Sequence, residues 1–174
     1  MLDDVEVGDA EAREAIGATV VIKLNGGLGT SMGLDKAKNL LEVRDGLNFL
    51  DLIVRQVRAA RRDWDAPLPL LFMNSFRTEA DTLAYLERYP DLPVDDLPLS
   101  FLQNQEPKLR ADDLTPVEWP KDPSLEWCPP GHGDLYTALW GQNLLQRFIE
   151  KGFRYACISN GDNLGAAPNA RLAG

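Results

Sequence analysis

The sequence feature that most constrains the fold is a short apolar segment that leads directly into a glycine-rich loop. Residues 20–33 have the sequence VVIKLNGGLGTSMG, and Lys38 follows closely. The apolar, β-branched character of residues 19–24 predicts a strand buried on both faces. Glycine reaches positive φ and has no Cβ to keep a ligand away, while exposed N–H groups and a lysine attract anions. We therefore expect a loop that holds the phosphate groups of a nucleotide.

Apolar and amphipathic segments alternate along the rest of the chain. Further strands are predicted at residues 40–43, 67–73, 99–102 and 154–159. Helices are predicted at residues 49–64, 78–88 and 134–150. Thr78 and Asp81 are spaced nearly as a capping box at the start of the second helix. Strands joined by helices predict an α/β fold, a three-layer sandwich with a mainly parallel sheet.

Polar residues follow several of the predicted strands. The loop at Gly26, and the residues Asn74, Gln103 and Asp162, each come directly or closely after a strand. Because ligands collect at the carboxyl ends of parallel strands, we expect these residues to converge on one edge of the sheet. For a single glycine loop, a purely structural turn is the plain alternative, and the convergence argues against it.

Two segments lie outside the alternation of strands and helices. Residues 1–18 are predicted to be an acidic, solvated leader with a short helix at residues 10–16. Residues 111–130 are rich in Pro, Asp and Trp and are predicted to be irregular but ordered.

Composition and charge restrict the classes of function. The chain has 174 residues, one domain's worth, and a net charge of −9, whereas nucleic-acid binders carry a basic face. Two cysteines are too few for a disulfide framework, and one histidine excludes a histidine-rich metal site. No apolar run is long enough to span a membrane, and the acidic N-terminus is unlike a signal peptide. We expect a cytoplasmic protein with no nucleic-acid or membrane partner; the sequence carries no signal for an oligomeric state.

Two common phosphate-binding fingerprints do not fit the glycine loop. A Walker loop requires a Lys-Ser or Lys-Thr pair after its second glycine, and no such pair follows here. The dinucleotide fingerprint G-x-G-x-x-G fails because Gly27, Gly29 and Gly33 have the wrong spacing. The loop therefore belongs to another class of nucleotide site.

Four segments together resemble the eukaryotic-type UDP-glucose pyrophosphorylase family, the UTP–glucose-1-phosphate uridylyltransferases. They are LNGGLGTSMG with Lys38, LFMNSF at residues 71–76, PPGHGD at residues 129–134 and SNGDNLG at residues 159–165. They occur in the family's order and extend over about residues 19–166. The resemblance implies a Rossmann-like, GT-A-like nucleotidyltransferase fold. It also implies that residues 19–174 are the N-terminal part of a catalytic domain, which we expect to be incomplete because family members are far longer.

The resemblance implies a nucleotide-binding role for the residues that match the family's loop. Lys38 matches the catalytic lysine that contacts the triphosphate, with Lys36 as its rival for that role. Gln103 matches a glutamine that contacts uracil, and Gly131 matches a backbone contact to the same base. The residues that match the loop around UTP are Leu24, Asn25, Gly26 and Gly27.

The resemblance also implies the reaction and its metal ion. His132 matches a residue that touches the sugar phosphate. Asn160, Gly161 and Asp162 match the segment near the α-phosphate, with Asp162 as the Mg²⁺ ligand. Glucose 1-phosphate would attack the α-phosphorus of UTP in line, giving UDP-glucose and pyrophosphate. Two alternatives stay open: a UDP-N-acetylhexosamine pyrophosphorylase, and a truncated nucleotide-binding fragment without turnover.

Overall fold

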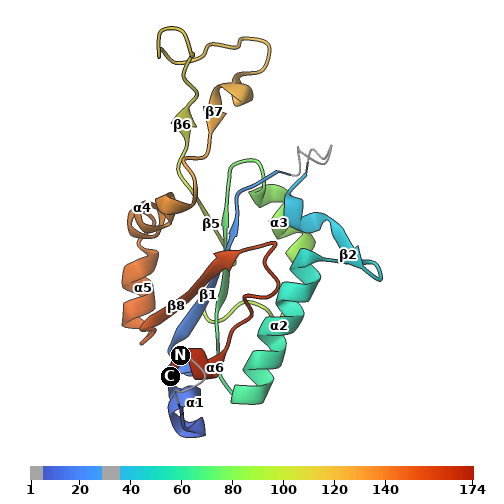
Figure 1. Ribbon diagram of the computed structural model, residues 1–174, viewed down its shortest axis with the longest axis vertical. Helices are drawn as coiled ribbons and strands as arrows, with labels where there is room; N and C mark the ends of the chain where they lie inside the picture. Colours follow the sequence, from blue (N-terminus) through green and yellow to red (C-terminus); the bar gives the residue numbers. More distant parts are fainter. Residues whose placement is uncertain (1–5, 29–35) are drawn as a thin grey trace.

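The computed structural model describes residues 6–28 and 36–174, and its centre is a sheet of four parallel strands (Figure 1). The strands are β1 (Thr19–Asn25), β4 (Leu70–Asn74), β5 (Ser100–Leu102) and β8 (Tyr155–Asn160). They lie side by side in the order β5-β4-β1-β8. The chain thus moves from β1 outward through β4 and β5, and then returns to the other side of β1 as β8. This change of direction creates a topological switch point between β1 and β8, the place where ligands bind in such sheets.

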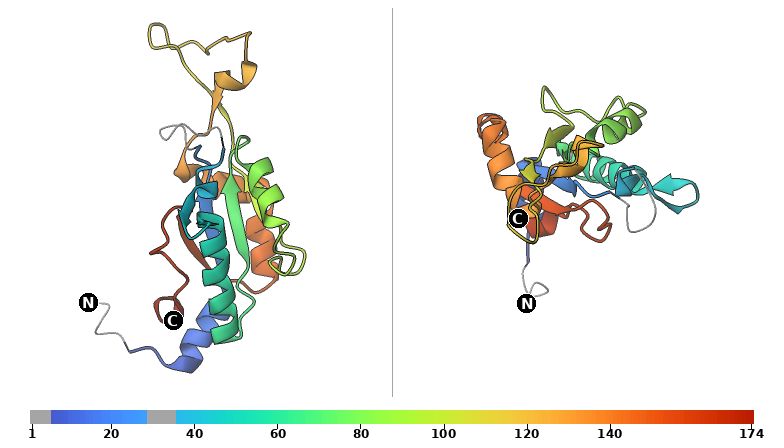
Figure 2. Two further views of the ribbon diagram at one scale, coloured as in Figure 1. Left: turned by 90° about the vertical axis from the view of Figure 1, so that its right-hand side faces the viewer. Right: turned by 90° about the horizontal axis from the view of Figure 1, so that it is seen from above.

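Helices cover both faces of the sheet (Figure 2). Against one face, α2 (Phe49–Trp64) packs Leu50 and Ile53 in a cluster with Val21 of β1. Against the other face, α4 (Leu135–Gly141) and α5 (Leu144–Glu150) pack in a cluster with Val20 and Ile22. Alternate side chains of β1 therefore enter opposite cores, as the pleat of a strand requires. The predicted α/β sandwich of three layers is confirmed.

The helix α2 begins and ends where the sequence predicts, at residues 49 and 64. The side chain of Asn48 accepts a hydrogen bond from the Asp51 amide, and the Asp51 carboxylate accepts one from the Asn48 amide, which completes a capping box. The same carboxylate accepts hydrogen bonds from the hydroxyls of Tyr85 and Tyr89. Asp51 therefore joins the first turn of α2 to α3 (Glu79–Leu86) and the turn that follows it.

The N-terminal helix α1 (Asp9–Gly17) corrects one expectation. The short helix predicted at residues 10–16 is present, but the expected solvated tail is wrong for these residues. Ala12 and Ile16 are buried in the same core as α2, and α1 contacts α6 (Ala170–Ala173) near the other end of the chain. Small and apolar positions on one face of an otherwise acidic helix were enough to bury it.

Three other predictions differ from the structure. The strand predicted at residues 40–43 is shifted: a 3-10 helix, η3 (Lys38–Leu40), ends at Leu40, and the strand β2 (Glu42–Arg44) begins at Glu42 and forms an exposed hairpin with β3 (Leu47–Asn48). The predicted helix at residues 134–150 is divided into α4 and α5, because Asn143 adopts a left-handed conformation with φ 58°. The capping box at Thr78 does not form, since the Thr78 hydroxyl accepts from the Ser75 amide instead.

The segment predicted to be irregular forms an arm that projects beyond the carboxyl end of the sheet (Figure 1). Its base is an antiparallel pair, β6 (Glu106–Pro107) and β7 (Trp127–Cys128), and a 3-10 helix, η4 (Pro123–Glu126), lies along it. A second 3-10 helix, η5 (His132–Asp134), returns the chain to α4. No helix within residues 6–28 and 36–174 is long and apolar enough to cross a bilayer.

Candidate functional site

A cavity of about 220 Å³ lies at the carboxyl ends of β1 and β8. Leu24 pairs with Asn160 where the two strands end, so the cavity opens at the topological switch point of the sheet. It is lined by Leu24, Asn25, Gly27, Lys38, Asn39, His132, Asn160 and Asp162. All of these residues except Asn39 were expected in the site from the sequence. Segments that are far apart in the chain are thus brought together as predicted.

The two ends of the glycine loop are held side by side. The Lys38 amide donates to the Gly27 carbonyl at 3.2 Å, and Leu28 forms an isolated antiparallel bridge with Ala37. This pairing places Lys38 beside the first glycines of the loop. The phosphate-holding function expected of Gly29 and Gly33 falls on residues 29–35, which lie outside the described residues.

Lys38 and Asp162 form an ion pair inside the cavity. The Lys38 Nζ lies 2.6 Å from the Asp162 Oδ2, and about a third of each side chain is exposed. The hydrogen bond from Lys38 lowers the pKa of the Asp162 carboxyl below its usual value, although partial burial opposes that shift. Asp162 is therefore an anion at neutral pH, and its oxygen is a hard ligand of the kind that a divalent cation prefers.

The side chain of Asn25 lies beneath the loop and is already engaged. Its Nδ2 donates to the Asn74 Oδ1 at 2.6 Å and to the Thr82 Oγ1 at 2.8 Å, and all three residues are buried. The Asn74 amide in turn donates to the Ser100 Oγ at the start of β5. Asn25 was expected to contact a nucleotide. Its side chain instead joins the end of β1 to the end of β4 and to α3, which leaves its backbone to face the cavity.

Gln103 supports the loop from the side of β5. It is buried, and a Cβ added to Gly26 would lie 2.1 Å from its Nε2, so a larger residue at position 26 would have to displace the Gln103 amide. Its Oε1 is buried without a hydrogen-bond partner within residues 6–28 and 36–174. Gln103 does not line the cavity of Lys38. It contacts Gly26, which lines a second cavity of about 350 Å³ on the other side of the loop, together with Ser75, Trp127 and neighbouring residues.

The remaining predicted residues lie around these two cavities. Gly131 has φ 110°, a conformation that favours glycine, and it begins the turn that carries His132 into the Lys38 cavity. The Asp134 carboxylate, which follows, accepts from the backbone and side-chain amides of Asn104 and so fixes this turn to the end of β5. The Gly161 amide donates to the Leu24 carbonyl at 2.9 Å. Neither glycine lines the Lys38 cavity.

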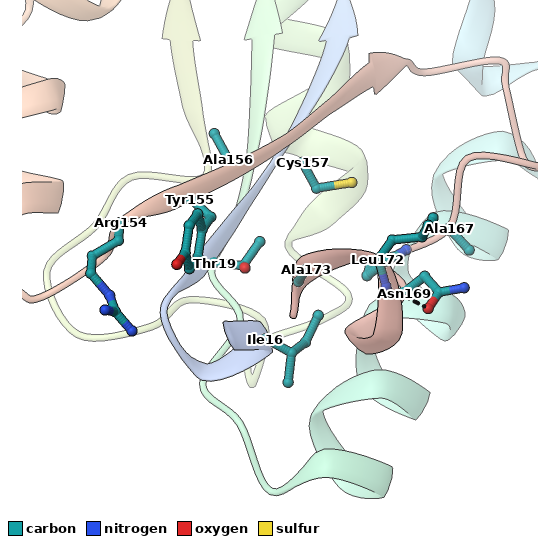
Figure 3. A pocket seen from close by; sticks show the side chains of 11 residues that line it. Ile16, Thr19, Arg154, Tyr155, Ala156, Cys157, Ala167, Asn169, Leu172 and Ala173 are labelled. Carbon is teal, nitrogen blue, oxygen red and sulfur yellow. Dashed lines mark hydrogen bonds between the residues drawn. The ribbon is translucent and has the colours of Figure 1, made fainter. Parts of the chain in front are cut away.

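A larger cavity, of about 480 Å³, lies at the opposite end of the sheet (Figure 3). It is bounded by Thr19 and Tyr155, which begin β1 and β8, and by Ile16 of α1 and Leu172 of α6. Ligands of parallel α/β sheets bind at the carboxyl ends of strands, and this cavity is at the amino ends. The candidate site is therefore the smaller, more polar cavity that contains Lys38.

The donor groups of the cavity allow a metal ion only in combination with a ligand. Within the described residues, no three His, Cys, Asp or Glu side chains are grouped so that they could hold a metal ion. Among the described residues that line the cavity, Asp162 is the one carboxylate. Mg²⁺ commonly binds through one or two carboxylates and completes its shell with water and substrate phosphates. Asp162 fits that arrangement.

Comparisons with known proteins agree with the site. The sequence profile of the family described as UTP–glucose-1-phosphate uridylyltransferase matches residues 2–174. The enzyme of that name from Solanum tuberosum is 41% identical over 164 residues, which are 94% of this chain and 34% of the relative. The corresponding Saccharomyces cerevisiae enzyme is 44% identical over 153 residues, 87% of this chain and 30% of the relative.

Solved structures give the same result. A variant of UDP-glucose pyrophosphorylase from Leishmania major, in complex with UDP-glucose, is 47% identical with a TM-score of 0.86. The alignment covers 99% of this chain and 36% of that one. A UDP-glucose phosphorylase from Trypanosoma brucei is 45% identical with a TM-score of 0.85 over 96% of this chain and 35% of its own. This chain spans about a third of the length of these relatives. A match over almost all of its residues, in a fold whose switch point holds Lys38 and Asp162, shows that the chain belongs to the UTP–glucose-1-phosphate uridylyltransferase family.

Proposed function

We propose that this chain carries the UTP site of a uridylyltransferase that makes UDP-glucose and pyrophosphate from UTP and glucose 1-phosphate. The observation that carries the proposal is the Lys38–Asp162 pair in a cavity at the switch point, directly beside the glycine loop. The family membership supports the proposal, because the relatives are named for this activity and one solved relative is in complex with UDP-glucose.

The uracil base would bind where Gln103 supports the loop. A carboxamide offers one donor and one acceptor, which complement the N3–H and O4 of uracil. The buried Oε1 of Gln103 has no partner among the described residues, and it lies beside Gly26. The second cavity, lined by Gly26 and reaching Pro129 at the base of the arm, gives a base room to approach. Gly131, which the family resemblance assigns to a backbone contact with the base, follows Pro129 two positions later.

The phosphates would occupy the Lys38 cavity. There the backbone of Gly27 and the Lys38 ammonium would stabilise negative charge, and His132 would contact the phosphate of the sugar. Asp162 would hold a Mg²⁺ ion, which supplies further neutralisation of the triphosphate when bound. Lys38 and Asp162 each bind a different partner in this arrangement, so their ion pair must open when substrate enters.

The reaction needs positioning more than it needs a reactive side chain. An oxygen of the glucose 1-phosphate forms a bond to the α-phosphorus of UTP, and the bond from that phosphorus to the departing pyrophosphate breaks. The attacking oxygen is already anionic near neutral pH, so no general base is required. The residues around the cavity would hold the two phosphates in line and stabilise the charge that spreads over the transferred group.

The proposal is tested in two stages with this chain and its Lys38→Ala variant. Calorimetry with UTP, and with ATP for comparison, measures binding, for which we expect a preference for UTP and a large loss in the variant. Chromatography then measures UDP-glucose after incubation with UTP, Mg²⁺ and glucose 1-phosphate, with N-acetylglucosamine 1-phosphate as the alternative substrate. Undetectable UTP binding contradicts the proposal. Binding without turnover supports the nucleotide site and identifies the chain as a binding portion of the enzyme.

A further inference from the structure

We propose that Asn39 is a further nucleotide-binding residue, whose side-chain amide donates a hydrogen bond to a phosphoryl oxygen of the bound nucleotide. This inference rests on the proposed function, because the acceptor belongs to the nucleotide in the Lys38 cavity. Asn39 follows Lys38 in η3, and of the described residues that line the cavity it is the one that the motifs do not assign.

The side chain of Asn39 is buried and its donor is unpaired. Only 3% of the residue is exposed, and its Nδ2 has no hydrogen-bond partner in the part of the chain that the structure describes. Buried polar groups are nearly always paired, so an unpaired one requires a reason. In a cavity beside a lysine, an anionic oxygen of a ligand is the acceptor that this donor lacks.

The turn opposite Asn39 is shaped around its amide. A Cβ added to Gly161 would lie 1.8 Å from the Asn39 Nδ2, so no larger residue fits there without displacing the amide. Gly161 does not have a positive φ, and its backbone conformation is therefore open to other residues. Glycine is needed at position 161 for the space that Asn39 takes, not for the conformation of the turn.

The neighbouring amide shows what a purely structural asparagine looks like at this site. Asn25 also lines the cavity, but its Nδ2 has two protein acceptors. The Nδ2 of Asn39 has no acceptor among residues 6–28 and 36–174. The terminal torsion of asparagine lies in a broad energy well, so a small rotation of the Asn39 amide within the space beside Gly161 can direct its Nδ2 at an acceptor in the cavity. Because Asn39 lies next to Lys38, its amide would donate to the same phosphate group that Lys38 binds.

Asn39→Ala separates this role from simple packing. Removing a hydrogen bond to a charged acceptor is expected to weaken UTP binding by about 10- to 100-fold in calorimetry. The melting temperature of the protein without UTP should stay the same or rise, because the variant also removes an unpaired buried donor. Gln146→Ala, which removes an exposed amide on α5, is the matched control and should change neither quantity.

A double-mutant cycle with Gly161→Ala completes the test. The added methyl group displaces the Asn39 amide, so Gly161→Ala should weaken UTP binding in the parent chain and should have much less effect in the Asn39→Ala background. Equal UTP affinity of the parent and Asn39→Ala, or a fall in melting temperature with no loss of affinity, overturns the inference and leaves the proposed function intact. Absence of UTP binding by the parent chain overturns both.

Discussion

At the scale of single residues, Lys38 and Asp162 are bound to each other at 2.6 Å, although the proposed reaction needs each of them for a different partner. The Lys38 ammonium is bound to the Asp162 oxygen that would otherwise coordinate a cation. The Asp162 carboxylate in turn neutralises the positive charge of Lys38 that would attract the phosphates. In the proposed reaction, substrate and metal ion would relieve this conflict only together, since the phosphates would bind Lys38 and the cation would bind Asp162. Metal binding and nucleotide binding should therefore be coupled.

Replacing Lys38 by methionine tests the coupling without requiring turnover. Lys38→Met frees Asp162, so Mn²⁺ alone should bind more tightly, while the affinity for UTP should fall by at least about tenfold, the loss of one charged hydrogen bond. Electron paramagnetic resonance of free Mn²⁺ measures the first effect, and calorimetry measures the second. Lys151→Met breaks an exposed ion pair with Asp96 far from the cavity and is the control. If Mn²⁺ affinity stays unchanged in Lys38→Met, the ion pair does not compete with the metal ion.

At the scale of elements, the sequence predicted the helices and strands whose boundaries are determined by residues close to them in the chain. The helix at residues 49–64 has regular apolar positions, an N-terminal capping box and an end at Asp65, and all three are local. The helix at residues 134–150 has equally regular apolar positions, but Asn143 breaks it, and nothing in the periodicity indicates that break. The strand expected at residues 40–43 begins only at Glu42, because so short an apolar run does not determine where its conformation starts.

The capping box of α2 gives a prediction about stability. Asn48→Ala removes the acceptor for the Asp51 amide and should lower the free energy of unfolding by about 0.5–2 kcal/mol, the usual cost of losing such a cap. Urea denaturation, followed by circular dichroism, measures the change. The control is Glu87→Ala, at the exposed end of α3. Thr78→Ala is unsuitable as a control because the Thr78 hydroxyl is buried and bonded to the Asn74 side chain. A change in Asn48→Ala no larger than that of the control would show that the box contributes little.

At the scale of the whole molecule, the convergence of the site follows from strand order, and this explains how much of it could be predicted. Because parallel strands end at one edge, the Gly26 loop, Asn74, Gln103 and Asp162 were expected to meet there. The start of the loop and Asp162 line the Lys38 cavity, whereas Asn74 bonds to Asn25 and Gln103 contacts Gly26 without lining that cavity. Contacts between particular side chains that are far apart in the chain could not be predicted from the sequence. The bond from Lys38 to Asp162, 124 positions apart, and the unpaired amide of Asn39 against Gly161 depend on packing that no motif encodes.

Lys23 joins β1 to the segment that carries Asp162 through long-range hydrogen bonds. The glycine-loop motif that contains Lys23 gave no indication of this role. The side chain is fully buried, which lowers the pKa of its ammonium, and its Nζ donates to the Ser159 Oγ at 2.7 Å and to the Ala166 carbonyl at 2.9 Å. It thereby fixes both ends of the segment that carries Asp162 to β1. Gln56 of α2 holds the middle of the same segment through the Leu164 carbonyl.

Lys23→Met should therefore release this segment while leaving the rest of the sheet intact. Methionine fills a similar volume and needs no partner, so the core around β1 should be preserved, but the Ala166 carbonyl loses its donor. Hydrogen–deuterium exchange should become faster by about tenfold or more at residues 161–166. The reason is that the free energy of local opening falls by the contribution of one hydrogen bond from a charged group. Exchange in β4 should stay unchanged. Because the released segment carries Asp162, the affinity for Mg²⁺ with UTP should fall in parallel. Uniformly faster exchange through β1, β4 and β8 would instead show that Lys23 stabilises the whole sheet and has no particular role at the site.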